Sequence, residues 1–155
     1  MICSILGTLL LVLLVAVCVP LTVPRMAGYQ IYAVVSGSME PAIPTGSLVY
    51  IKQTEPESIK EDDVIAFYGT RDAGSIITHR VVGNSVVTGE FITKGDANKT
   101  NDMNPVSYDQ LIGKVAVSIP HAGILAQLFT STTGKIAAAG VILASILFHV
   151  VASRL

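Results

Sequence analysis

The sequence predicts a mainly β domain of the barrel or sandwich type, with an apolar helix at each end. Three observations predict it: a charge-free apolar run from Met1 to Pro24, a second apolar run from Ile136 to Ser153, and short β-branched segments between them. Only 14% of the 155 residues are charged, against about 25% in a typical soluble domain. We therefore expect an anchor over residues 1–25, a β-rich domain over 26–134 and a second membrane helix over 135–155.

The first apolar run is predicted to be a retained membrane anchor. Its core, Ile5 to Val23, has the length of roughly 20 residues that crosses a bilayer. The alternative is a cleaved signal peptide, but such peptides have a basic start, a shorter apolar core of about 7–15 residues and a clear cleavage site. The run lacks all three features before the next motif begins.

The second run, Ile136 to Ser153, lies near the short end of the roughly 17–25 residues that span a membrane. It is apolar on every face, which favours lipid over a buried amphipathic helix. Gly140 and Ala144 have the small-residue spacing that permits close helix packing. His149 lies near the carboxyl end, where its ring can reach the interface uncharged, so we assign it no function.

The middle of the chain is β-rich, because its apolar runs are short and are separated by Gly, Pro, Asn and Asp. The expected strands are Ser47–Lys52, Val64–Tyr68, Ser75–Val82, Ser85–Thr93 and Lys114–Ile119. We expect Gly83-Asn84 to separate the third from the fourth, and Thr54–Asp63 to be a charged surface connection. His121 follows Pro120, where a helix or reentrant turn begins, and is predicted to be a surface residue.

Composition excludes several kinds of function. The net charge of −1 gives no electrostatic reason to expect nucleic acid. Cys3 and Cys18 are the only cysteines and both lie in the first apolar run, so the polar middle has no disulfide and no cysteine metal site. No metal or organic cofactor is expected.

Ser38, in the run Ser36 to Pro41 (SGSMEP), is the first candidate for chemistry. A serine in a Gly-Ser turn is usually structural, but Gly37 removes a side chain beside the hydroxyl and so lets a substrate backbone approach. If the segment is extended, Ser36 shares a face with Ser38. Its hydroxyl, together with the Ser38 backbone N–H, could then donate to a developing oxyanion.

His79 and two carboxylates could complete an activated serine. His79 lies in an expected strand, with Thr78 and Arg80 facing the other way, and its reference pKa of about 6.5 suits a general base. Asp96 and Asp102 lie at either end of a polar turn. That turn is not an EF-hand, because the required glycine and closing glutamate are missing. A core histidine and a solvated loop are the alternatives, and the residues leave open which carboxylate would orient the imidazole.

These motifs resemble the signature boxes of type I signal peptidases. SGSMEP, THR, and KGDAN followed by ND occur in the family's order. They are similar to the branch found in the endoplasmic-reticulum complex, in archaea and in some Gram-positive bacteria. The resemblance implies a signal-peptidase-like fold, with Ser38 as nucleophile and His79 as general base where the other branch has a lysine. Asp102 matches the third triad member.

The remaining assignments also come from the resemblance. Asp96 matches a second acidic residue, and Ser36 the position that assists the oxyanion. Lys94 and Lys99 leave an opening for a Ser-Lys mechanism, but neither aligns with that lysine.

The function implied is a membrane-bound serine endopeptidase that cleaves N-terminal signal peptides from exported preproteins after small residues. Its domain would lie on the extracytoplasmic side of the cell membrane or the endoplasmic-reticulum membrane. Expected partners are preproteins and the lipid bilayer, with complex subunits left open. The alternatives are a non-catalytic accessory subunit and a related peptidase with a narrow clientele.

Overall fold

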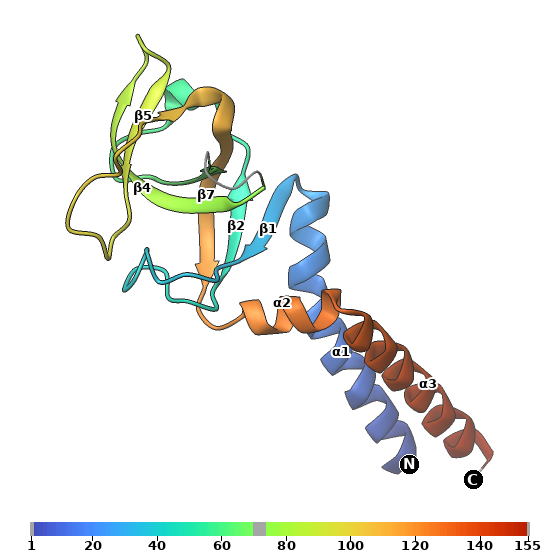
Figure 1. Cartoon of the computed structure of the whole chain (residues 1–155). Helices are drawn as coiled ribbons and strands as arrows, with labels where there is room; N and C mark the ends of the chain where they lie inside the picture. Colours follow the sequence, from blue (N-terminus) through green and yellow to red (C-terminus); the bar gives the residue numbers. More distant parts are fainter. Residues whose placement is uncertain (1, 70–73, 155) are drawn as a thin grey trace. The chain divides into compact units, whose positions relative to one another are not determined.

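The computed structural model describes residues 2–69 and 74–154, and the chain divides into two compact units (Figure 1). The helical unit consists of the residues up to Met26 and those from Ile124 onward. The β unit is Ala27–Gly123. The predicted fold class, mainly β with an apolar helix at each end, is confirmed.

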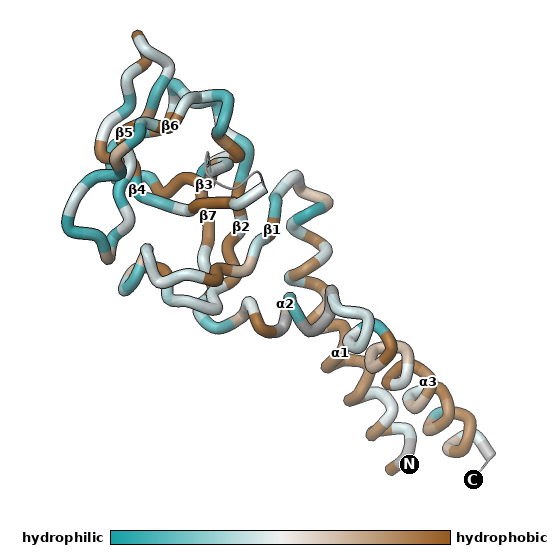
Figure 2. Tube along the Cα trace, in the orientation of Figure 1, coloured by the Kyte–Doolittle hydropathy of each residue, from teal (hydrophilic) through white to brown (hydrophobic). Residues whose placement is uncertain are grey.

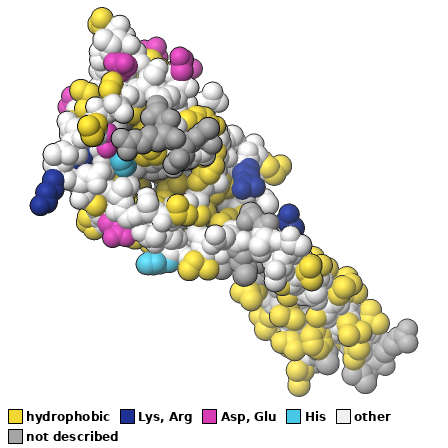
Figure 3. All heavy atoms as spheres, viewed as in Figure 1, with side chains coloured by type: hydrophobic (Ala, Val, Ile, Leu, Met, Phe, Trp, Pro, Cys, Tyr) yellow, Lys and Arg dark blue, Asp and Glu magenta, His cyan; other side chains and the backbone are white. Residues whose placement is uncertain are grey.

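Two helices of the helical unit are long and apolar enough to cross a membrane. Helix α1 (Ile2–Met26) contains one such stretch, Ser4–Met26, and helix α3 (Thr132–Arg154) contains the other, Thr132–Ser153. Figure 2 shows both as predominantly hydrophobic, and Figure 3 shows apolar side chains over their visible face. The short helix α2 (Gly123–Thr130) precedes α3. The second apolar helix thus begins four residues before the predicted Ile136.

Helices α1 and α3 meet at a small polar contact. The Ser145 hydroxyl is buried and donates to the Gly7 carbonyl oxygen at 2.8 Å. A β-carbon built on Gly7 would lie 2.6 Å from Nδ1 of His149, so the helices approach where the first one has no side chain. The small-residue spacing at Gly140 does not mark such an approach, because a β-carbon there would meet no heavy atom within 4 Å.

The β unit contains one antiparallel seven-stranded sheet, a half barrel, in the order β1-β2-β7-β3-β4-β5-β6. Its strands are β1 (Tyr29–Ala33), β2 (Leu48–Lys52), β3 (Val64–Tyr68), β4 (Ile76–Ser85), β5 (Glu90–Lys94), β6 (Val106–Ser107) and β7 (Leu111–Ile119). The charged connection after β2 contains a single 3-10 turn, Pro56–Ser58. His121 follows β7 and is exposed, as expected of a surface residue.

The turn predicted at Gly83-Asn84 is wrong. Strand β4 continues through both residues with a register shift between Val81 and Gly83, and the chain turns at 86–89 instead. The Asn84 amide explains this, because it donates to the carbonyl oxygens of Pro56 and Ile59, each at 2.9 Å. These bonds hold Asn84 in the sheet, and Gly89, at a φ of +68°, supplies the left-handed conformation of the turn.

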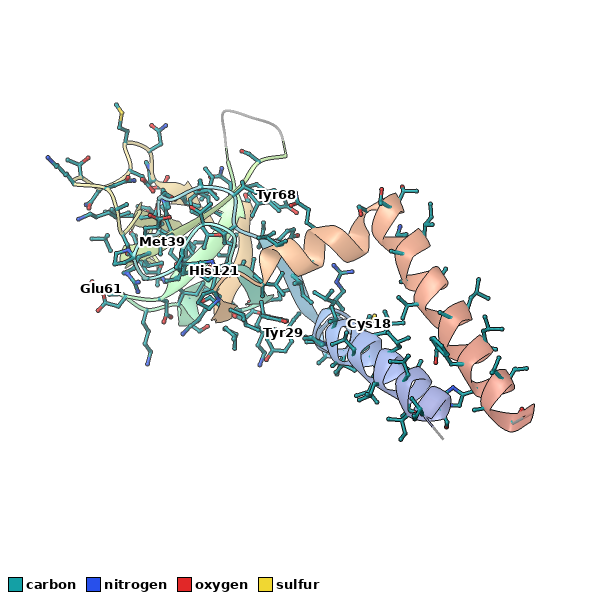
Figure 4. All side chains as sticks on the ribbon, turned by 90° about the horizontal axis from the view of Figure 1, so that it is seen from below. Cys18, Tyr29, Met39, Glu61, Tyr68 and His121 are labelled. Carbon is teal, nitrogen blue, oxygen red and sulfur yellow. The ribbon has the colours of Figure 1, made fainter. Side chains whose placement is uncertain are left out.

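Two apolar clusters fill the β unit. One contains Met39, Ile43, Val49, Ile51, Ala66 and Ile112, and the other contains Ile59, Ile65, Phe67, Val81, Phe91 and Val106. Figure 4 shows Met39 among the crowded side chains of this unit and Glu61 at its periphery. Because Met39 is only 1% exposed, its burial fixes the neighbouring Ser38 at the edge of the first cluster.

Candidate active site

Ser38 lies in a turn between β1 and β2 rather than in an extended segment. The Glu40 amide donates to the Gly37 carbonyl oxygen at 3.1 Å, and the Ile43 amide donates to that of Met39 at 2.8 Å. The condition under which Ser36 and Ser38 would share a strand face is therefore not met. Both serines nevertheless line one cavity of about 260 Å³, together with Thr78 of β4.

His79 makes a close contact with Asp102. Nδ1 of the ring lies 2.6 Å from Oδ2 of the carboxylate, and the two side chains are 11% and 23% exposed. A carboxylate only accepts hydrogen bonds, so this contact places a proton on Nδ1 and leaves Nε2 of the neutral ring as the basic nitrogen. The Phe67 ring packs edge-on against the imidazole, with centroids 6.3 Å apart.

Gly95 is where His79 and the Ser38 turn come together. A β-carbon built on Gly95 would lie 2.6 Å from the Ser38 carbonyl oxygen and 3.0 Å from Nε2 of His79. The Ala97 amide donates to the same Ser38 oxygen at 2.9 Å. The basic nitrogen and the serine main chain thus border one glycine, which has no side chain to separate them.

Asp96 has a different partner from Asp102. Its two carboxylate oxygens accept from Nε and Nη2 of Arg80 at 2.8 and 2.6 Å, a bidentate pair. This hydrogen bonding raises the pKa of the Arg80 guanidinium above its usual value. Arg80 also donates to the Asp62 carbonyl oxygen at 2.7 Å. The geometry therefore places Asp102 on the imidazole and Asp96 in a link between β4 and the loop after β5.

Two residues at this site were missed by the sequence reasoning. Thr93 donates from Oγ1 to Oδ2 of Asp102 at 2.7 Å, and Gly95 forms the junction described above. Both are buried, as is Phe91 of β5, so the alternate residues 91 and 93 of the strand and Gly95 just after it face inward. A hydroxyl at an inward position between an aromatic residue and a glycine was the available signal.

The lysine alternative has little geometric support. Lys94 lies between two inward-facing positions of β5 and so belongs to the opposite face, and Lys99 is exposed. Among the residues that the structure describes, no group of three or more His, Cys, Asp or Glu side chains is placed to hold a metal ion.

Comparison with known proteins gives a family match and several relatives. A family model described as signal peptidase, peptidase S26, matches residues 5–98. The chain is similar to signal peptidase I W of Bacillus subtilis (strain 168), at 41% identity over 90 residues, which are 54% of this chain and 45% of that protein. It is also similar to the signal peptidase complex catalytic subunit SEC11 of Fusarium vanettenii, at 33% identity over 110 residues, 64% and 63% of the two chains.

A third relative, the signal peptidase complex catalytic subunit SEC11C of Canis lupus familiaris, is 29% identical over 108 residues, 61% of this chain and 54% of that protein. The chain thus spans less than two thirds of the length of these relatives. The family match includes Ser38, His79 and Asp96 but ends before Asp102.

Proposed function

Since the chain belongs to the signal peptidase family, peptidase S26, we propose that it is a membrane-bound serine endopeptidase that removes N-terminal signal peptides from exported preproteins. The observation that carries the proposal is the contact of His79 Nδ1 with Asp102 at 2.6 Å, with Nε2 of the same ring and the Ser38 turn both bordering Gly95. This is the order of groups that activates a serine hydroxyl.

The proposed reaction begins when Ser38 Oγ attacks the carbonyl carbon of the scissile peptide and Nε2 of His79 takes the hydroxyl proton. The peptide C–N bond then breaks, the imidazolium returns that proton to the leaving amine, and an acyl-enzyme remains. A water molecule, deprotonated by the same nitrogen, then attacks the acyl carbon; the ester bond to Ser38 Oγ breaks, the imidazolium returns the proton to that oxygen, and the signal peptide leaves with a free carboxylate. Asp102 keeps Nδ1 protonated and stabilises the imidazolium, while the Ser38 N–H and the Ser36 hydroxyl donate to the oxyanion.

The cavity beside Ser38 suits an extended peptide. Residues 76–79 of β4 pair with β3 on one edge, and β4 pairs with β5 only from Arg80 onward. Within residues 2–69 and 74–154, no strand occupies the other edge of 76–79. Ile76, Ile77 and Thr78 of that segment line the cavity of about 260 Å³, as do Ala33 and Val34. A substrate strand could add there by main-chain hydrogen bonds, which would bring the small-residue cleavage site of a signal peptide beside Ser38.

The membrane setting completes the proposal. Both apolar helices would cross the bilayer, anchoring residues 26–134 beside the surface where the apolar part of a signal peptide ends. We place the β unit on the extracytoplasmic side of the cell membrane or the endoplasmic-reticulum membrane. Two of the relatives are named as subunits of a signal peptidase complex, so partner subunits are a further element of the proposal.

The test is a preprotein-processing assay with the full chain in detergent. Ser38→Ala and His79→Ala should each abolish cleavage while keeping the far-UV spectrum of the parent protein. Ser58→Ala and His121→Ala change the same residue types at exposed positions and should cleave normally. Full cleavage by folded Ser38→Ala would refute Ser38 as the nucleophile, whereas no cleavage by the folded parent protein would indicate a non-catalytic role.

A further inference from the structure

Asp102 lies outside any strand, in the loop between β5 and β6, yet its carboxylate must hold one orientation to serve His79. The outer torsion angle of an aspartate side chain, which turns the carboxylate, has a broad distribution, so the side chain does not fix that orientation by itself. Something on the more rigid sheet has to hold it, and Thr93 of β5 is the residue in contact.

Thr93 contacts Asp102 through two hydrogen bonds. Its hydroxyl donates to Oδ2 at 2.7 Å, and its carbonyl oxygen accepts from the Asp102 amide at 2.8 Å. The Thr93 side chain is only 1% exposed, so water has little access with which to replace the hydroxyl. Oδ2 is also the atom that lies 2.6 Å from Nδ1 of His79.

We propose that Thr93 is a positioning residue, whose hydroxyl fixes the Asp102 carboxylate and, through it, the tautomer and orientation of His79. The inference rests on the proposed function. The hydroxyl has one proton, and the contact with Oδ2 directs it at the carboxylate. Without that proton, Oδ2 is left with the imidazole as its side-chain donor and the carboxylate is free to rotate away.

A packing role for Thr93 makes the opposite prediction, because threonine also fills a buried β position with a branched side chain. Thr93→Val keeps the shape and removes the hydroxyl, whereas Thr93→Ser keeps the hydroxyl and removes the methyl group. If Thr93 positions Asp102, the serine variant keeps its activity and the valine variant loses it. If Thr93 only packs, the valine variant is the better of the two.

The expected loss in Thr93→Val is about tenfold in kcat, because a hydrogen bond to a charged group is removed. KM should stay near its parent value, since Thr93 does not line the cavity beside Ser38. Thr100→Val makes the same chemical change at an exposed position of the neighbouring loop and should alter neither constant. If Thr93→Val instead lowered activity only by unfolding part of the sample, the loss of activity would match the decrease in the amplitude of the thermal unfolding transition.

The experiment measures kcat, KM and melting temperature for the full-length chain in detergent, with a preprotein substrate. The parent protein and Ser38→Ala are assayed first, so failure of the proposed function shows before Thr93 is tested. Should Thr93→Val not fold, Thr93→Ser and Thr93→Ala form a second pair that differs only in the hydroxyl. Equal kcat within the pair, or parent kcat in folded Thr93→Val, would overturn the proposal.

A double-mutant comparison tests whether Thr93 acts through Asp102. In the Asp102→Asn background, adding Thr93→Val should change kcat by less than about twofold, because the group being positioned has already lost its role. A further drop of about tenfold in that background would show that Thr93 acts independently, and would contradict the inference.

Discussion

Replacing Gly95 by alanine tests the site at the point where its parts meet. The new β-carbon would lie 2.6 Å from the Ser38 carbonyl oxygen, 2.8 Å from the Asn98 amide nitrogen and 3.0 Å from Nε2 of His79. Ordinary carbon contacts begin at about 3.5 Å, so the new β-carbon and the Ser38 main chain must separate by close to 1 Å, and the imidazole must also shift. A misplacement of that size costs on the order of a hundredfold in rate.

The assay is preprotein cleavage in detergent with purified Gly95→Ala, at matched amounts of folded protein. We expect kcat to fall about a hundredfold and stability to fall by about 1–3 kcal/mol, the usual cost of overpacking. Gly83→Ala is the matched control on neighbouring β4, because a β-carbon there would meet only Ile92, at 4.0 Å. Parent activity in folded Gly95→Ala would show that Ser38 and His79 do not react across this junction.

Three further predictions concern the two aspartates, the acid response and the helix contact. Asp102→Asn should lower kcat by about 10³–10⁴-fold with the fold intact, as loss of the tautomer does in a serine triad. Asp96→Asn should mainly lower the melting temperature. A larger loss of kcat in Asp96→Asn than in Asp102→Asn would show that the roles of the two carboxylates are assigned wrongly. Burial alone would raise the pKa of Asp63, but its hydrogen bond to Lys114 lowers it below the ordinary 3.8. The stabilisation is therefore present above pH 3.8 and lost as the pH falls through the lower folded value. Asp63→Asn should have a lower melting temperature than the parent at pH 7, and the difference should shrink as the pH falls below 3.8. A difference in melting temperature that does not change with pH would disprove this. Gly7→Leu should destabilise the protein in detergent, whereas Gly140→Leu, facing open space, should not. Equal melting temperatures for the two variants would show that the helix contact is dispensable.

Local signals explain why much of the fold could be predicted. Long apolar runs and short β-branched runs are properties of neighbouring residues, and they predicted both long helices and most strands. Strand β6 has only two residues and exists through its pairing with β5, so no local pattern could reveal it. The turn at Gly83-Asn84 was mispredicted because Asn84 is held by residues of a distant connection.

The candidate site divides in the same way. The residue types and the motif order pointed to Ser38 and His79, but the choice between Asp96 and Asp102 is a matter of tertiary geometry. Only the folded chain shows that Arg80 takes the first carboxylate and His79 the second. Thr93 escaped notice because a buried threonine in a strand usually fills space.

The most direct measurement is the mass of the products formed from a preprotein by the full chain in detergent. We expect one cut, after a small residue at the end of the apolar part of the signal peptide, that disappears in Ser38→Ala. The same cut made by folded Ser38→Ala, or no cut by the parent protein, would contradict it.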